Sequence, residues 1–221
     1  MDRVTRATEV LRILRHTYPD AHCELDHDGP FQLLIATILS AQCTDVRVNM
    51  VTPALFKKYP DAKTMAMAPL EDLQELIHST GFFRNKAKNI QAAAQGVEEK
   101  HAGLVPPELK SLVNLPGVGR KTANVVLGNA YGIEAGVVVD THVARLSKRL
   151  GLTKQTDPVK IEKDLARAVA QDTWTLWSHL LIWHGRRRCW ARSPDCEGCE
   201  LAKICATAFQ HTKKAKPPKR K

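Results

Sequence analysis

The stretch "LPGVGRKTA", residues 115–123, sets a proline and two glycines directly before Arg120 and Lys121. Proline and glycine favour a tight turn. The segments on either side, "PPELKSLVN" (106–114) and "RKTANVVLGNAYG" (120–132), have the composition of short helices. Together they predict a helix–hairpin–helix motif over about residues 108–130, although a plain turn between two helices would give the same pattern.

The two glycines would let backbone amides approach an anion without obstruction by side chains, at a helix N-terminus that favours negative charge. Such amides recognise phosphate but read no base sequence, which suits a protein that scans DNA. A Walker loop is excluded, because Arg120 stands where that motif needs glycine and no strand precedes the turn.

Helical spacing of apolar residues dominates the rest of the chain. Helices are expected over 4–18, after Asp28 as an N-cap, over 69–80, over 84–100, after Asp140, after Asp157, and over 173–187. Only "GVVVD" at 136–140 is β-branched, and it is too short to form a sheet by itself. The sequence therefore predicts an all-α protein made of many short helices.

Charge is distributed unevenly along the 221 residues. The net charge is +10, but the last nine residues, "KKAKPPKRK", carry six of those charges, which leaves +4 for residues 1–212. The tail, 212–221, is expected to be a basic disordered segment that adds either unspecific phosphate affinity or solubility. No apolar run reaches membrane-spanning length, and "MDRVTRATEV" lacks the apolar core of a signal peptide, so we expect a cytoplasmic, nucleoid-associated protein.

Lys121 and Asp140 together suggest amine catalysis. A lysine that attacks carbon must be neutral, and a helix N-terminus and desolvation both favour the neutral form. Asp140 would favour the charged form instead, so it is expected to accept a proton during attack or to face a developing cation. The simpler interpretation is that Asp140, in "VVVDTHVAR", is the N-cap of the next helix.

Four of the six cysteines fall within residues 189–205, in the pattern Cys-x6-Cys-x2-Cys-x5-Cys. In a cytosolic chain such a cluster indicates a metal rather than disulfides. Four thiolates can bind zinc or an iron–sulfur cluster, and the single Cys-x2-Cys pair, Cys196 and Cys199, favours iron–sulfur over a structural zinc site.

These segments resemble the endonuclease III branch of the helix–hairpin–helix DNA glycosylases. The matching segments, in family order and covering nearly the whole chain to about residue 210, are "PFQLLIATILSAQCTD", "GFFRNKAKNI", "LPGVGRKTANVV", "VDTHVAR", "HGRRRC" and the four-cysteine loop. The resemblance implies two helical domains with the active site in the cleft between them. One is a six-helix barrel domain at 23–133, and the other is an iron–sulfur cluster domain formed by 1–22 and 134–211.

The resemblance also implies a function, a bifunctional DNA glycosylase and AP lyase of base excision repair. Such an enzyme removes oxidised pyrimidines through a lysine Schiff base and cuts the strand by β-elimination. The expected partner is double-stranded DNA with an oxidised pyrimidine or an abasic site, bound by a monomer without membrane contact.

Individual residues take their expected roles from the same resemblance. Lys121 matches the Schiff-base nucleophile and Asp140 the essential carboxylate. Gln42 matches the residue that fills the gap left by the flipped nucleotide, and Phe82 the intercalating wedge, where many relatives have leucine. The ligands of a [4Fe–4S] cluster match Cys189, Cys196, Cys199 and Cys205. Further DNA contacts are expected from Leu115, Gly117, Val118, Gly119, Arg120 and Arg192.

Two other functions fit parts of the sequence. An adenine mismatch glycosylase shares the scaffold, but it has glutamate at the position of Thr37, lacks the lysine at position 121 and carries a C-terminal domain, whereas sixteen residues follow Cys205 here. A non-catalytic helix–hairpin–helix module with a structural metal would leave Lys121 and Asp140 without a chemical role.

Overall fold

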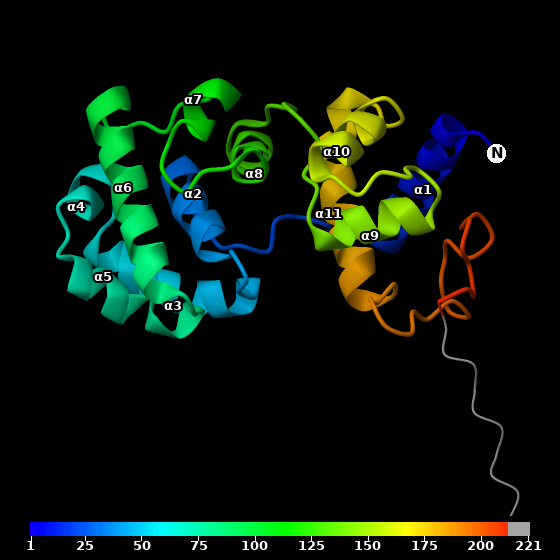
Figure 1. The fold of residues 1–221 in the computed structure, drawn as a ribbon, viewed down its shortest axis with the longest axis horizontal. Coiled ribbons are helices and arrows are strands. Elements are labelled where there is room, and N and C mark those ends of the chain that lie inside the picture. Colours follow the sequence, from blue (N-terminus) through cyan, green and yellow to red (C-terminus); the bar gives the residue numbers. More distant parts are fainter. Residues whose placement is uncertain (212–221) are drawn as a thin grey trace, which may run out of the picture. The chain divides into compact units, whose positions relative to one another are not determined.

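The computed structural model describes residues 1–211, so the expected disordered tail at 212–221 lies outside the described residues. The chain divides into two compact units, one formed by Cys23–Ala135 and the other by Met1–His22 together with the chain from Gly136 onward. Every regular element over residues 1–211 is a helix, and no strand occurs there, so the predicted all-α class is confirmed (Figure 1). No helix in this part of the chain combines the length and the apolar character needed to cross a membrane.

The unit formed by Cys23–Ala135 is built around one apolar helix, α2 (Pro30–Leu39), which packs against α3, α6 and α8 (Figure 1). Seven consecutive side chains of α2, from Leu33 to Leu39, are buried. The other elements of this unit are α3 (Asp45–Lys58), α4 (Ala62–Ala66), α5 (Leu70–Leu76), the 3-10 helix η1 (His78–Thr80), α6 (Phe83–His101), α7 (Leu109–Val113) and α8 (Arg120–Tyr131).

Two local expectations for this unit need correction. The N-cap of α2 is Gly29, whereas the backbone N–H of Asp28 donates to the side chain of Gln32, 3.0 Å away. The sequence analysis also missed α3 and α4; α3 contains Pro53 in its interior, a residue that usually marks a helix boundary.

The second unit combines both ends of the described chain. It contains α1 (Arg3–Thr17), α9 (Thr141–Arg149), α10 (Pro158–Ala166), η2 (Gln171–Thr173), α11 (Trp174–Arg187) and a loop that carries the four clustered cysteines. α11 contacts both α1 and α9, and Leu14 of α1 and Trp177 of α11 are fully buried in one core. The β-branched segment at 136–140 forms no strand; Val137, Val138 and Val139 are buried, and the N–H of Val138 donates to Ser178 Oγ at 3.0 Å.

The helices that begin near Asp140 and Lys121 differ in their N-terminal caps. Asp140 is the N-cap of α9, and its Oδ1 accepts a hydrogen bond from the N–H of Val143 at 2.7 Å. Asp157 caps α10 in the same manner. α8 begins after Gly119, which has no side chain to satisfy the first amides of the helix. The structural role considered for Asp140 from the sequence is therefore present.

Because Asp140 is a cap, its substitutions separate stability from any chemical role. We expect Asp140→Ala to destabilise the unit that contains α9 by about 0.5–2 kcal/mol, whereas Asp140→Asn, which can still accept the bond from Val143, leaves stability nearly unchanged. Urea unfolding followed by circular dichroism measures both variants. Equal loss of stability in the two would contradict the capping account.

Candidate functional site

The hairpin between α7 and α8 places backbone rather than side chains at its surface. Leu115 and Val118 are buried in the core, and the N–H of Val118 donates to the carbonyl of Leu115 at 3.1 Å. Gly117 has a φ of +73°, and a Cβ there would lie 3.0 Å from Cβ of Asn89. Any DNA contact by Leu115 or Val118 therefore has to come from their backbone.

Two glycines of the hairpin leave amides free for a ligand. The N–H groups of Gly117 and Gly119 donate to no backbone carbonyl of residues 1–211, and a Cβ built on Gly119 would meet nothing within 4 Å. Together with the uncapped first turn of α8, they form a set of backbone donors that is open to an anion. This arrangement suits a phosphate group.

Lys121 is the second residue of α8 and is exposed to solvent, as is Arg120 before it. Lys121 therefore follows the open amides of the hairpin by two residues, and its side chain is accessible to a ligand bound there. The desolvation expected from the sequence is not supplied by this chain's own residues, because the Lys121 side chain is not buried.

Gln42 and Phe82, the two residues expected at the DNA gap, share an uncommon backbone geometry. Gln42 has a φ of 51° and Phe82 a φ of 48°, in the left-handed region that non-glycine residues seldom adopt. Both are exposed, and Phe82 retains 66% of its accessible surface. Exposed side chains on such backbone are typical of functional sites.

Lys86 lies beneath these two turns and was missed by the sequence analysis. It is only 4% exposed, and its Nζ donates at 2.8 Å to the carbonyl of Thr80, which lies two residues before Phe82. Burial lowers the pKa of Lys86, while the charge interaction with Cys43, which follows Gln42, acts in the opposite direction. Lys86 thus braces the Phe82 turn and lies close to the Gln42 turn.

Asp140 belongs to the other unit, so Lys121 and Asp140 are positioned by separate cores. It is half-buried at the start of α9. Two residues later, burial lowers the pKa of His142, and the negative charge of Asp140 opposes that effect. The charge of Asp140 thus interacts with His142 and Arg145, both on α9.

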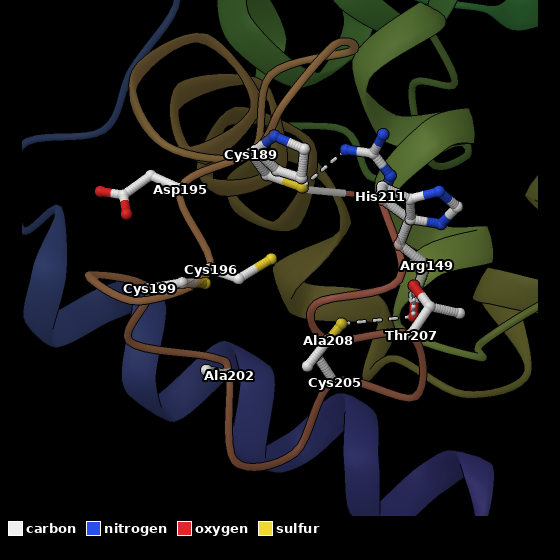
Figure 2. Close-up of a pocket in the computed structure, with 11 residues that line it drawn as sticks. Arg149, Cys189, Asp195, Cys196, Cys199, Ala202, Cys205, Thr207, Ala208 and His211 are labelled. Carbon is white, nitrogen blue, oxygen red and sulfur yellow. Dashed lines mark hydrogen bonds between the residues drawn. The ribbon is translucent and has the colours of Figure 1, made fainter. Parts of the chain in front are cut away.

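The four clustered cysteines line one cavity. The cavity, about 330 Å³ including its open mouth, has Cys189, Cys196, Cys199 and Cys205 in its wall, and Figure 2 shows their sulfur atoms around it. Burial raises the pKa of the Cys199 thiol to about 11 and also raises the pKa of Cys205. Over the described residues, which include all four, no three of these sulfurs lie within 4.8 Å of one another.

Arginines from α9, which the sequence analysis did not single out, hold this loop. Nη1 of Arg149 donates to Cys189 Sγ at 3.2 Å (Figure 2). The same atom donates to the carbonyl of Trp190 at 2.7 Å. Arg145 donates to the carbonyls of Gly185 and Cys189. The loop takes its shape from these bonds, whereas Arg192 is exposed and available to a partner. Only the tertiary structure pairs α9 with the loop; the sequence carries no signal for it.

Comparisons with known proteins agree on one family. The sequence matches HhH-GPD, the superfamily of base excision DNA repair proteins, over residues 35–171. An endonuclease III of Synechocystis sp. is 59% identical over 203 residues, which are 92% of this chain and 93% of that protein. The endonuclease III of Bacillus subtilis is 48% identical over 89% of this chain and 90% of the relative.

Solved structures give the same result. A non-covalent complex of an endonuclease III with DNA and a trapped covalent endonuclease III–DNA intermediate each align with a TM-score of 0.90 at 43% identity, over 95% of this chain and 98% of the other. A thermostable thymine-DNA glycosylase at 22% identity and a TM-score of 0.81 shares the fold. The chain thus belongs to the HhH-GPD superfamily of base excision DNA repair proteins and, within it, to the endonuclease III family.

Proposed function

We propose that the protein is a bifunctional DNA glycosylase and AP lyase that removes oxidised pyrimidines from duplex DNA. The observation that carries the proposal is the exposed amine of Lys121 beside an uncapped helix start and two free glycine amides. A phosphate held by these amides would bring the sugar of the same DNA strand towards an amine. Relatives at 43% identity have been solved with DNA, one of them as a covalent intermediate, which supports this assignment.

The proposed reaction begins with a base rotated out of the stack, because the sugar carbon is inaccessible inside the duplex. Lys121 Nζ forms a bond to C1′ as the bond from C1′ to the base breaks, and the base leaves with the bonding electrons and a proton. The C1′–O4′ bond then breaks and O4′ takes up a proton, so the sugar ring opens and an iminium forms between C1′ and the lysine nitrogen. This iminium acidifies the hydrogen on C2′. Loss of that proton forms a carbon–carbon double bond while the C3′–O bond breaks, so the strand is cut 3′ to the lesion; water then releases the lysine.

The reaction needs a neutral amine and a group that accepts a proton or stabilises positive charge, and we assign these two requirements to bound DNA and to Asp140. The amine attacks only when neutral, and because Lys121 is exposed in the free protein, the exclusion of water has to come from bound DNA. We assign the acceptance of a proton, or the stabilisation of the cationic sugar, to the Asp140 carboxylate.

Gln42 and Phe82 are proposed to occupy the space that the rotated nucleotide leaves. Unstacking costs a few kcal/mol, which an aromatic ring and an amide inserted into the stack can offset. Their exposure and left-handed backbone support this role, since both side chains project from turns rather than packing on the core. We extend the DNA contact to Arg120, Arg192 and the hairpin backbone.

We further propose that the four cysteines bind a [4Fe–4S] cluster. A tetrahedral zinc site with Zn–S bonds near 2.3 Å would bring its sulfurs to about 3.8 Å from one another. The wider separation of these thiols, with no three within 4.8 Å, fits a cluster in which each thiolate binds a different iron. Since the burial of Cys199 and Cys205 favours their protonated forms, cluster binding has to release protons. The cluster would cross-link residues 189–205 and so hold Arg192 in place.

The adenine mismatch alternative receives no support from Thr37. This residue is buried, and its hydroxyl donates to the carbonyl of Leu33 at 2.7 Å, so it offers no carboxylate for chemistry on a base. We propose that the protein acts as a cytoplasmic monomer on chromosomal DNA.

Substitution of the amine tests the nucleophile. With a duplex that contains an abasic site or thymine glycol, we expect borohydride to trap a covalent adduct of the unmodified protein, and Lys121→Gln to abolish both trapping and strand cutting. Lys110→Gln, which removes an exposed lysine of α7, is the matched control and should trap normally. The duplex should still bind to Lys121→Gln in fluorescence anisotropy. Continued trapping by that variant would rule out Lys121 as the nucleophile.

The cluster is tested by elemental analysis of anaerobically purified protein. We expect about four iron atoms and about four acid-labile sulfides per chain, and their loss in Cys199→Ala. Cys23→Ala, outside the loop, should retain both. Zinc without sulfide in the unmodified protein would contradict the assignment.

A further inference from the structure

The His184 imidazole lies between the tyrosine at the end of α1 and one of the clustered cysteines. His184 belongs to α11 and is only 1% exposed. Its Nδ1 is 3.1 Å from the hydroxyl of Tyr18, and its Nε2 is 3.4 Å from Cys199 Sγ. Each ring nitrogen therefore has one partner, and the partners come from opposite ends of the chain.

The direction of these bonds follows from the groups that flank Nδ1. Burial is the main cause that raises the pKa of Tyr18, to about 12, so its hydroxyl keeps its proton and can donate. The other neighbour of Nδ1, Glu200, lies 3.9 Å away, beyond hydrogen-bond distance, and its carboxylate is held by Arg188 at 3.2 Å. With Nδ1 accepting from Tyr18, the ring proton resides on Nε2 and is directed at the sulfur.

We propose that Tyr18 and His184 form a hydrogen-bond relay that orients Cys199 as a cluster ligand and raises the reduction potential of the cluster. The inference rests on the proposed [4Fe–4S] cluster. A donor at a thiolate sulfur withdraws electron density and stabilises the more negative, reduced state. Both side chains are positioning residues, since they act through Cys199 and reach neither DNA nor the reacting sugar.

A competing arrangement is a separate metal site. Nδ1 or Nε2 of His184, Cys199 Sγ and a Glu200 oxygen lie within 4.8 Å of one another, the one such triad among the described residues. This triad would have to take Cys199 from the other three cysteines, which would then surround their cavity with one ligand missing. The bond between Tyr18 and Nδ1 also favours the relay, because it leaves Nε2 as a donor to sulfur rather than as a metal ligand.

The experiment compares three variants of the full-length protein with its cluster bound. His184→Leu removes the donor, His184→Gln offers an amide N–H in its place, and Tyr18→Phe removes only the hydroxyl that fixes the ring. Tyr131→Phe is the matched control, because it removes a tyrosine hydroxyl that donates to the carbonyl of Val105 in the other unit. The measurements are iron and sulfide content, midpoint potential by film voltammetry, and the rate of cluster bleaching by an iron chelator.

We expect the cluster of His184→Leu to have a more negative midpoint potential and to be bleached faster by the chelator. Tyr18→Phe should shift the potential in the same direction by less, and His184→Gln and Tyr131→Phe should remain close to the unmodified protein. If both His184→Leu and Tyr18→Phe hold a full cluster with an unchanged midpoint potential, the relay is wrong and the cluster assignment stands. If His184→Leu fails to fold, the midpoint potentials of Tyr18→Phe and His184→Gln test the relay instead. Absence of iron and sulfide from the unmodified protein would overturn the cluster and the relay together, and zinc bound through His184 would establish the separate metal site.

Discussion

The packing of α1 against α11 is the contact on which the cysteine-bearing unit depends. Leu14 and Trp177 are both fully buried where these helices meet, so the first residues of the chain complete a core that is otherwise formed by its second half. Full burial of a leucine side chain contributes about 1.5–3 kcal/mol to the free energy of folding. The same packing places the hydroxyl of Tyr18 within hydrogen-bond distance of His184. Because His184 also contacts Cys199, the packing determines the surroundings of that thiol.

The two helix starts that carry the proposed chemistry differ in what satisfies their amides. At α9, the Asp140 carboxylate accepts a hydrogen bond from the N–H of Val143, so the fold holds a negative charge in a defined position. At α8, Gly119 provides no side chain, and the amides stay open to an anion from outside. The N-terminus of α9 thus supplies a carboxylate, whereas the N-terminus of α8, which includes Lys121, has amides that can bind a phosphate.

Two cations that donate to backbone carbonyls shape the loops that would meet DNA. Lys86 uses its amine to hold the carbonyl of Thr80 below Phe82, and Arg149 holds the carbonyl of Trp190 in the cysteine loop. Because Lys86 is buried, water does not compete for its amine, and its bond to the carbonyl of Thr80 fixes the turn more firmly than an exposed bond would. This explains how exposed, strained tips such as Phe82 can be held by a compact interior.

The features that could be predicted from the sequence are those that depend on neighbouring residues. Helix periodicity, the hairpin before Lys121, the cap at Asp140 and the cysteine spacing are all local, and local patterns fix backbone conformation. The structure alone decided which distant segments meet: α3 formed despite Pro53 because its apolar face packs on α2, and Tyr18 reached His184 across 166 residues. Such pairings arise from burial of whole helix faces, a property of the folded core that no short stretch of sequence contains.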